Sequence, residues 1–340
     1  MSVLTRLIES HWQQPRLWLT CLLYPLSRLF QVVAGLRTAL YRSGCLKSVR
    51  LNVPVIVVGN LHAGGVGKTP VTAALAQSLR QQGIRVGIVS RGYGRESQET
   101  LLVDVRGDAA DYGDEPLLLA QKTGVPLAVG RDRAAAAQLL LQHFPATQII
   151  LSDDGLQHYR LARDMEIVVF PAGDARRQRL DVLPNGPLRE PLSRLRDADA
   201  LIISNDEQHV TPTFRLPEKV CLYRSRLFQQ DFYALNQPER TVAADFFAGK
   251  KVVALAAIAR PQRFFNTLAQ LNIHPTAHIA LPDHAALSAD DIPSDADIVL
   301  VTEKDAVKLA RFALPQVWVL PVYAIITPDL SAEIISRYVR

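Results

Sequence analysis

Short apolar runs rich in β-branched residues recur along the chain and alternate with segments of helical periodicity. The runs predict strands at residues 53–58, 85–90, 101–105, 125–129, 148–153, 165–170 and 200–204. Helices are expected from Lys68 to a stop at Gly83, from the 113–116 segment through Lys122, and over 131–142. Strands that alternate with helices indicate an α/β protein, with a mainly parallel sheet covered by helices on both faces.

The second half of the chain has a different pattern. Residues 209–248 alternate polar and apolar positions without a clear helix, which predicts a β linker. Beyond it we expect a helix over 261–271 and strands at 251–256, 276–280, 297–302 and 317–323. The predicted parts are an N-terminal segment (1–50), a core domain (51–208), the linker, and a smaller α/β domain (249–340) that closes over the site.

Residues 17–36 are mostly apolar, and their few polar side chains fall on one narrow helical stripe. Pro25 is expected to kink or interrupt this helix. Arg28 lies too centrally, and the apolar run is too short, for a membrane span. A helix lying in the membrane interface fits better. A helix packed on the protein core and a true span are the alternatives.

Charge and cysteine usage narrow the choice of partners. The net charge is +5, but residues 1–50 carry seven arginines and lysines against one glutamate, so the remaining chain sums to −1. Because the basic character is local, it argues against a nucleic-acid surface and for an anionic partner at the N-terminus. The three cysteines lie far apart in the sequence, which fits a reducing cytosol. With 340 residues, 48% of them hydrophobic, the chain has material for a sizeable core.

The main chemical motif spans residues 55–70, where a strand, a glycine-rich turn and a helix opening at Lys68 and Thr69 follow one another. This is the context of a P-loop, which binds nucleotide phosphates. The backbone of Gly64, Gly65, Val66 and Gly67 would surround phosphate oxygens, Lys68 would reach the β- and γ-phosphates, and the Thr69 hydroxyl would hold Mg²⁺. His62 stands where the strict motif has glycine. An ordinary glycine turn is the alternative.

Acidic residues near strand ends are candidates for metal binding and proton transfer. Asp153 and Asp154 close the predicted strand at 148–153, where a P-loop enzyme holds Mg²⁺, although such a pair alone is typical of a turn. Asp114 and Glu115 leave two interpretations open: a helix N-cap, and a base or metal partner facing the γ-phosphate. His284 is either structural or tunes proton transfer to an aspartate base.

Three further segments have a chemical and a plain interpretation. Residues 302–305 close a strand and open a helix, so capping explains them. In the loop 186–191, Arg189 is suited to phosphate or headgroup recognition and Glu190 to the metal shell, unless the loop is simply solvated. The arginine-rich tract 172–179 is a basic lip or another solvated loop.

Taken together, these segments closely resemble the tetraacyldisaccharide 4'-kinase family, the lipid A 4'-kinases of the lipopolysaccharide pathway. The likeness covers nearly the whole chain, and the DDGLQH and GPLREP segments are its most specific parts. The matching motifs begin at Gly59, Ser90, Gly113, Asp153, Gly186, Asp283 and Thr302. The chain departs from the family pattern at Ala285, where a second histidine is usual, and at 176–182, where a Gly-Asn stretch is usual.

The resemblance implies ATP-dependent phosphorylation of the 4'-hydroxyl of a tetraacylated glucosamine disaccharide 1-phosphate, which gives lipid IVA. It implies a peripheral enzyme on the cytoplasmic face of the inner membrane, and we expect a monomer. Asp114 would accept the hydroxyl proton with help from His284. Lys68 and Asp154 complete the catalytic candidates. The metal candidates are Thr69, Asp153, Asp154, Glu115 and Glu190, and the nucleotide- or lipid-contact candidates are Arg91, Tyr93, His158 and Arg189.

Two other functions are compatible with the P-loop. One is a soluble P-loop ATPase or small-molecule kinase, in which the N-terminal helix is merely structural. The other is a nucleotide-switched membrane scaffold that binds and slowly hydrolyses ATP without phosphorylating lipid.

Overall fold

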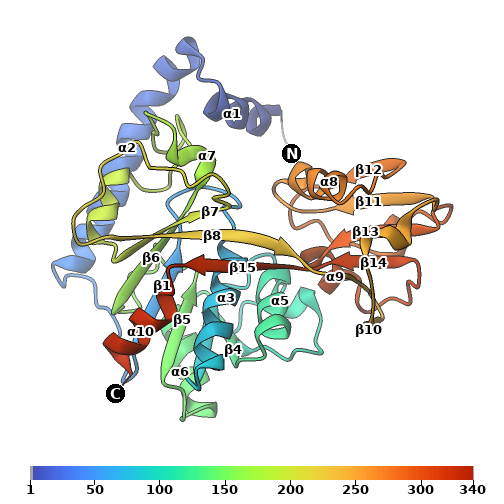
Figure 1. Ribbon diagram of the computed structural model, residues 1–340. Helices are drawn as coiled ribbons and strands as arrows, with labels where there is room; N and C mark the ends of the chain where they lie inside the picture. Colours follow the sequence, from blue (N-terminus) through green and yellow to red (C-terminus); the bar gives the residue numbers. More distant parts are fainter. Residues whose placement is uncertain (1–2, 340) are drawn as a thin grey trace.

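The computed structural model describes residues 3–339. Two units, each built on its own sheet, lie side by side. The N-terminal helix α2 (Leu17–Arg42) runs along the larger one, and α1 (Val3–Gln13) lies at its upper end (Figure 1). In the described chain, the larger sheet has nine strands in the order β15-β8-β7-β6-β1-β5-β2-β4-β3, and the smaller has six in the order β10-β9-β14-β13-β11-β12. The expected α/β class, mainly parallel and P-loop-like, is confirmed.

The larger sheet is parallel from β4 to β8, and antiparallel strands pair at both of its edges. Its central strand is the one that precedes the P-loop, so the P-loop opens at the middle of the sheet's carboxyl edge. The strands of this sheet are β1 (Val55–Gly59), β2 (Val86–Ser90), β3 (Leu101–Leu102), β4 (Leu127–Val129), β5 (Ile149–Asp153), β6 (Met165–Pro171), β7 (Ala200–Ser204), β8 (Cys221–Gln229) and β15 (Val322–Thr327).

Each face of this sheet carries its own apolar cluster, because successive side chains of a strand point to opposite faces. In β1, Ile56 and Val58 join a cluster with α3, α5 and α10, whereas Val55 and Val57 join another with α6. The helices of this unit are α3 (Lys68–Gln81), α4 (Ala109–Tyr112), α5 (Asp114–Thr123), α6 (Arg133–His143), α7 (Ala172–Ala175), the 3₁₀ helix η1 (Leu192–Asp197) and α10 (Leu330–Tyr338).

The smaller sheet is also covered on both faces. Phe265 and Leu268 of α8 pack on one face, and Leu309 of α9 packs on the other. Its strands are β9 (Phe232–Ala234), β10 (Gln237–Val242), β11 (Val252–Ala256), β12 (Ala277–Ala280), β13 (Ile298–Thr302) and β14 (Val317–Leu320). Its helices are the 3₁₀ helices η2 (Ala244–Phe247) and η3 (Ala289–Asp291), together with α8 (Pro261–Gln270) and α9 (Glu303–Leu309).

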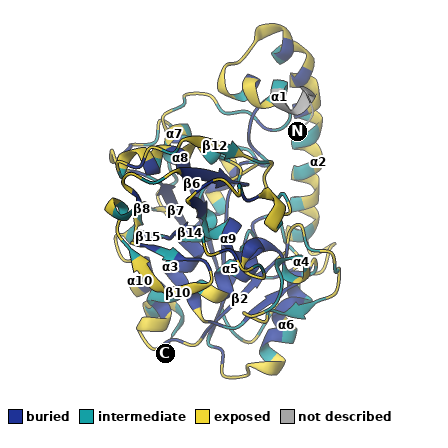
Figure 2. Ribbon diagram, turned by 90° about the vertical axis from the view of Figure 1, so that its right-hand side faces the viewer, coloured by how far each residue is buried: buried dark blue, intermediate teal, exposed yellow. Residues whose placement is uncertain are grey.

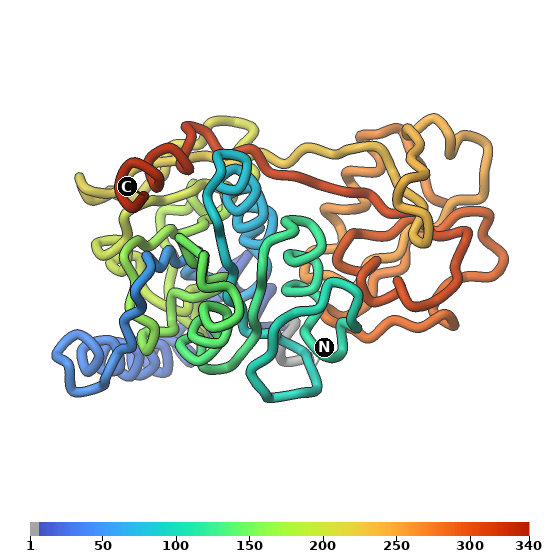
Figure 3. Tube along the Cα trace, turned by 90° about the horizontal axis from the view of Figure 1, so that it is seen from below, coloured from blue at the N-terminus to red at the C-terminus, as the bar shows by residue number. Residues whose placement is uncertain are grey.

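The structure divides the second half of the chain differently from the prediction. The predicted linker is not a separate part, because β8 extends the larger sheet while β9 and β10 belong to the smaller one. The predicted strand at 317–323 is two strands in two sheets, separated at Pro321. Residues beyond Pro321 return to the larger unit, where α10 packs beside α3. Figure 3 shows the two strands that pass side by side between the units.

The N-terminal segment forms two helices, α1 (Val3–Gln13) and α2 (Leu17–Arg42). Pro25 lies on the exposed side of α2 and does not interrupt it, so the expectation of an interruption is wrong. By length and composition alone, α2 is long and apolar enough to cross a membrane. It buries Leu19, Leu23 and Ser27, half-buries Phe30, and leaves most of its other large apolar side chains exposed along the molecule (Figure 2).

Candidate active site

The P-loop joins the end of β1 to the start of α3. Gly64 and Gly67 have φ angles of +96° and +88°, which residues with a side chain rarely adopt, so glycine is required at both positions. Gly67 is the residue before α3, and the free N–H groups of that helix start face the loop. The Lys68 ammonium lies 3.2 Å from Asn60 Oδ1 and 3.5 Å from Asp154 Oδ1.

Neighbouring strands and loops hold this loop in place. The Ser204 hydroxyl, at the end of β7, donates to the Val66 carbonyl at 2.7 Å. The Ala63 N–H donates to the Pro187 carbonyl at 2.7 Å, so the 186–191 loop pairs with the P-loop. His62, at the position where glycine is usual, is buried against Phe170 with Nε2 3.2 Å from Asp174 Oδ2. An imidazole therefore fills the space under the loop.

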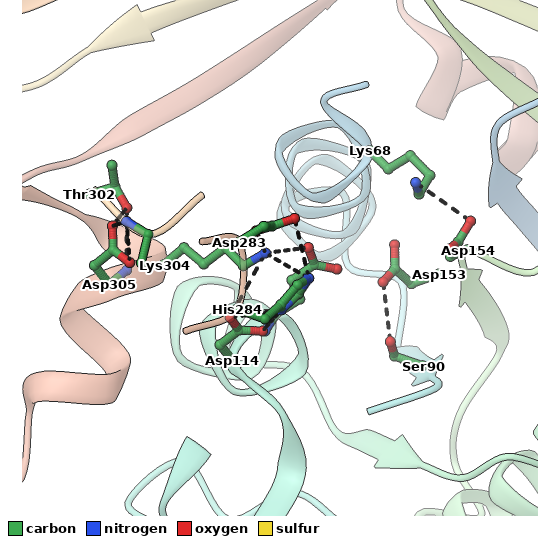
Figure 4. Close-up of polar contacts among 12 residues, drawn as sticks. Lys68, Ser90, Asp114, Asp153, Asp154, Asp283, His284, Thr302, Lys304 and Asp305 are labelled. Atoms are coloured by element: carbon green, nitrogen blue, oxygen red, sulfur yellow. Dashed lines mark hydrogen bonds and ion pairs between the residues drawn. The ribbon is translucent and has the colours of Figure 1, made fainter. Parts of the chain in front are cut away.

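Asp153 and Asp154 have opposite environments although they are adjacent. Asp153 is buried at the end of β5, where it accepts from the Thr72 and Ser90 hydroxyls at 3.1 and 3.2 Å. Burial, together with the charges of Glu115 and Asp154, raises its pKa to about 6. For Asp154, burial acts in the same direction, but Lys68 and Arg189 outweigh it and lower the pKa below its usual value. Asp154 is therefore the more firmly ionised carboxylate (Figure 4).

A second polar cluster lies across the interface between the two units. Asp114 starts α5 in the larger unit, and His284 comes from a loop of the smaller unit, with Nδ1 3.1 Å from both Asp114 carboxylate oxygens. Burial would raise the pKa of Asp114, but the hydrogen bond from His284 and the charge of Lys304 lower it. Burial would lower the pKa of His284, but Asp114 raises it. Gly113 rather than Asp114 is the N-cap of α5, so capping does not explain Asp114, and its role as a base or metal partner stays a prediction.

The other predicted contact residues lie around these two groups. The Tyr93 ring, 58% exposed, packs against His284 with its centroid 4.8 Å away. Arg189 Nη1 lies 3.4 Å from Asp154 Oδ2, and Arg91 is exposed. The pKa of His158 is lowered to about 4 by burial and by the charges of Arg133 and Arg91, so its imidazole is neutral at physiological pH.

Two predicted metal ligands have other partners in this structure. Glu115 Oε1 accepts from Lys304 Nζ at 2.9 Å. Glu190 is buried, where Gln157 Nε2 donates to one of its oxygens at 2.7 Å and the Tyr159 hydroxyl donates to the other. The contacts of Glu190 therefore do not support its expected metal role. The sequence pattern could not reveal these contacts. At 302–305 the capping interpretation is confirmed, because Thr302 Oγ1 accepts from the Asp305 N–H.

The residues present suit one Mg²⁺ ion that is held partly by a nucleotide. Asp154 Oδ1 is buried and, within residues 3–339, has no hydrogen-bond partner besides its ion pair with Lys68, and Thr69 is the second residue of α3. In the same described residues, no three His, Cys, Asp or Glu side chains converge to hold a metal by themselves. Mg²⁺ commonly uses one or two carboxylates together with phosphate and water oxygens. The donor set therefore fits Mg²⁺ that arrives with ATP.

Several residues at the site had no clear signal in the sequence. Asn60 is buried beside Lys68, and its Nδ2 donates to the His62 carbonyl at 3.0 Å. Arg133 is buried at the start of α6, where burial lowers its pKa to about 10. Lys304 lies between Glu115 and His284. Its one available signal was a lysine in the first turn of a helix, where acidic residues are favoured.

A central P-loop, a carboxylate at the end of the neighbouring strand, and an aspartate–histidine pair that joins the two units define a P-loop phosphotransferase. The family model of the tetraacyldisaccharide-1-P 4'-kinases (LpxK) matches residues 19–339. The chain belongs to this family. The prediction of a lipid A 4'-kinase, made from the motifs, is thereby confirmed.

Individual relatives agree over almost the full length. The chain is 50% identical over 331 residues to the tetraacyldisaccharide 4'-kinase of Neisseria gonorrhoeae, covering 97% of this chain and 95% of the relative. It is 48% identical to that of Chromobacterium violaceum, covering 98% of both. A crystal structure described as the "apo" form of LpxK from Aquifex aeolicus in complex with ATP matches with a TM-score of 0.79 at 30% identity, covering 93% of this chain and 98% of that one.

Proposed function

We propose that the site carries out in-line transfer of the γ-phosphoryl group of ATP to the 4'-hydroxyl of a tetraacylated glucosamine disaccharide 1-phosphate. The observation that carries the assignment of roles is the Asp114–His284 pair, whose two members come from different units (Figure 4). The known ATP complex of the Aquifex aeolicus relative supports ATP as the donor.

In this proposal the residues of the P-loop and its neighbours neutralise the negative charge of the ATP phosphates. The N–H groups of residues 64–69 bind phosphate oxygens, and Lys68 meets the charge that spreads over the γ-phosphoryl oxygens in the transition state. Thr69 and Asp154, with Asp153 behind them, would hold Mg²⁺, which supplies further charge neutralisation on the phosphates. Asn60 keeps the Lys68 ammonium directed toward the loop.

The residues around Asp114 and His284 bind and deprotonate the acceptor, the sugar hydroxyl. Asp114 is held ionised by His284, so that it orients the sugar hydroxyl and accepts its proton as the new oxygen–phosphorus bond forms and ADP leaves. Tyr93 packs on the His284 ring and limits its movement. Arg91, His158 and Arg189 are placed to contact the sugar or its phosphate.

The exposed apolar face of the N-terminal helix α2 supports an enzyme that works at a membrane. The large apolar side chains of α2 that remain exposed form one stripe, which is too extensive for a helix buried in a protein core. The arginines of this segment would contact anionic headgroups of the cytoplasmic leaflet of the inner membrane. The lipid would then keep its acyl chains in the bilayer while a monomeric enzyme binds the sugar head.

The test is transfer of radiolabel from the γ-phosphate of ATP to tetraacyldisaccharide 1-phosphate in mixed micelles, with Lys68→Ala protein alongside. We expect labelled lipid from the wild type only. Hydrolysis of ATP without labelled lipid would favour a membrane scaffold or another substrate. Full activity without detergent after removal of residues 1–40 would favour a soluble kinase.

A further inference from the structure

Lys304 is in an unfavourable position for the helix that carries it. It is the second residue of α9, and the first turn of a helix has a partial positive charge that favours acidic side chains. Glu303 and Asp305, on either side of it, follow that rule. The lysine side chain is also only 15% exposed. Helix formation therefore does not explain a lysine here, and its contacts must.

Within the described chain, the Lys304 ammonium contacts only residues of the polar cluster around Asp114 and His284. Its Nζ lies 2.9 Å from Glu115 Oε1, 3.2 Å from Asp283 Oδ1 and 3.2 Å from His284 Nε2. It is also 3.8 Å from Asp114 Oδ2. Figure 4 shows the lysine reaching from α9 into the middle of this cluster.

The contact with Lys304, which is shorter than the 3.6 Å from Nε2 to Asp283 Oδ2, favours one position of the His284 proton. An ammonium group has three N–H donors and no lone pair, so Nε2 must accept and remain unprotonated. The imidazole proton then lies on Nδ1, which faces both oxygens of Asp114. His284 therefore donates to the carboxylate, as an orienting partner of a base should.

We propose that Lys304 is a positioning residue for phosphoryl transfer: its ammonium holds His284 in the Nδ1–H form and ties it to Asp114 when the two units meet. This inference rests on the proposed function, in which Asp114 accepts the sugar proton. The lowered pKa of Asp114, to which the charge of Lys304 contributes, agrees with it.

The same contacts also mean that Asp114, His284 and Lys304 come together only when the two units are in contact. Asp114 and Glu115 lie on α5 of the larger unit, whereas Asp283, His284 and Lys304 belong to the smaller one. The pairing of Lys304 with Glu115 therefore exists only when the units are together. An open enzyme would lack both the orienting imidazole and the cation that orients it.

A second ion pair joins the same two helices and offers a matched control. Lys122 Nζ on α5 lies 2.6 Å from Glu303 Oε2 on α9, and both side chains are nearly as buried as that of Lys304. Contacts of Lys122 with Asp114 or His284 are absent among the hydrogen bonds and ion pairs of residues 3–339. Its removal weakens the interface without touching the base.

The experiment compares full-length wild type, Lys304→Met, Lys304→Arg and Lys122→Met in the lipid transfer assay. We expect Lys304→Met to lower kcat about 10- to 100-fold, the usual effect of losing an orienting partner, with KM for ATP within about 2-fold. Lys304→Arg should recover about 10-fold of that loss because it keeps a cationic donor. Lys122→Met should lower Tm comparably while kcat falls by less than about 3-fold.

Nitrogen NMR of ¹⁵N-histidine-labelled protein reports the protonation state of each ring nitrogen of His284. A Lys304 that only stabilised the interface would leave this signal unchanged. The His284 signal, identified by its loss in His284→Gln, should report protonated Nδ1 in the wild type and a mixture of tautomers in Lys304→Met. Lys304→Gln, which keeps a polar side chain, replaces the Met variant if that variant does not fold.

Three results would overturn the inference. One is an unchanged His284 tautomer without Lys304, and another is an equal loss of kcat in Lys122→Met and Lys304→Met. The third is a Lys304→Met enzyme with normal kcat beside an inactive Asp114→Asn. Wild-type turnover in Asp114→Asn would instead remove the proposed base itself, and the inference with it.

Discussion

Single residues of this site are distinguished by their neighbours more than by their type. Asp153 and Asp154 share a strand end, yet their pKa values move in opposite directions. Burial and the neighbouring carboxylates raise the pKa of Asp153, whereas the cations around Asp154 outweigh burial and lower its pKa. The pattern of two aspartates after an apolar run identified the location. It did not show which carboxylate is free to meet a metal, since Thr72, Ser90 and Arg189 come from other elements.

Removal of either charge at the phosphate side should reduce turnover without unfolding the protein. We expect Lys68→Ala and Asp154→Ala to lower kcat by about 10²- to 10³-fold, because each loses a charged contact made in the transition state. Both side chains border the loop rather than the core, so Tm should stay within a few degrees of the wild-type value. Lipid transfer rates with thermal unfolding on the same samples test this, and wild-type rates in both variants would contradict the assigned roles.

The neutral His158 makes stability depend on pH. Its folded pKa of about 4 lies below the unfolded value of about 6.5, so the unfolded chain takes up the proton first as pH falls. The free energy of unfolding is therefore unaffected by this proton above pH 6.5, and it falls as the pH drops from 6.5 to 4. Between pH 7 and 5, wild type should therefore lose more unfolding free energy than His158→Gln, by on the order of 1 kcal/mol after allowance for partial exposure.

Urea unfolding at the two pH values measures this difference. His143→Gln replaces an exposed imidazole at the end of α6 and is the matched control, which should keep the pH dependence of the wild type. Equal losses of unfolding free energy in wild type and His158→Gln would show that the His158 imidazole is not held neutral.

Among the elements, α2 has two sides with clearly different surroundings. One side docks through Ser27, whose hydroxyl accepts from the Asn185 N–H at 2.9 Å, and through Arg28, which pairs with Asp181. The other side exposes a stripe of large apolar residues that includes Leu22 and Leu29, each 62% exposed. Periodicity predicted the helix and the stripe, but not the partner of its buried side, because that loop lies more than 150 residues further along the chain.

Charges placed on the exposed stripe should release the protein from membranes. We expect Leu22→Glu with Leu29→Glu to reduce cosedimentation with vesicles of phosphatidylethanolamine and phosphatidylglycerol by about 10-fold or more, with little change in Tm. Arg106→Glu is the control, since it makes the same change in net charge on an exposed loop. Equal binding of the double variant and the wild type would contradict a membrane role for this face.

At the scale of the whole molecule, the site is formed by the meeting of two units. Ala259 of the smaller unit lies beside the P-loop, since a Cβ added to Gly65 would lie 3.3 Å from the Ala259 Cβ. The strand and helix patterns and the motifs gave both halves of the site. They did not give the contact between halves, because Asp114 and His284 are 170 residues apart and meet only through the packing of α5 against the smaller unit.

A bulky side chain at Ala259 should hold the units apart. Ala259 is exposed, so Ala259→Phe should leave Tm nearly unchanged, while kcat falls about 10- to 100-fold because the base is displaced from the phosphates. Ala259→Ser, which adds one atom, should keep near-normal turnover. Lipid transfer assays and thermal unfolding of the two variants decide this, and full activity in the Phe variant would contradict close apposition during catalysis.

The smaller unit is attached to the larger one by two neighbouring strands, β8 and β15. Gln229 pairs with Val322, and the Gln230 N–H donates to the Pro321 carbonyl at 3.2 Å, so both connections leave the larger sheet as one narrow ribbon. A two-stranded ribbon bends across its face much more readily than within its plane. We therefore expect movement of the smaller unit to be a rotation about this ribbon, so that little orientational entropy is lost when the two units come together.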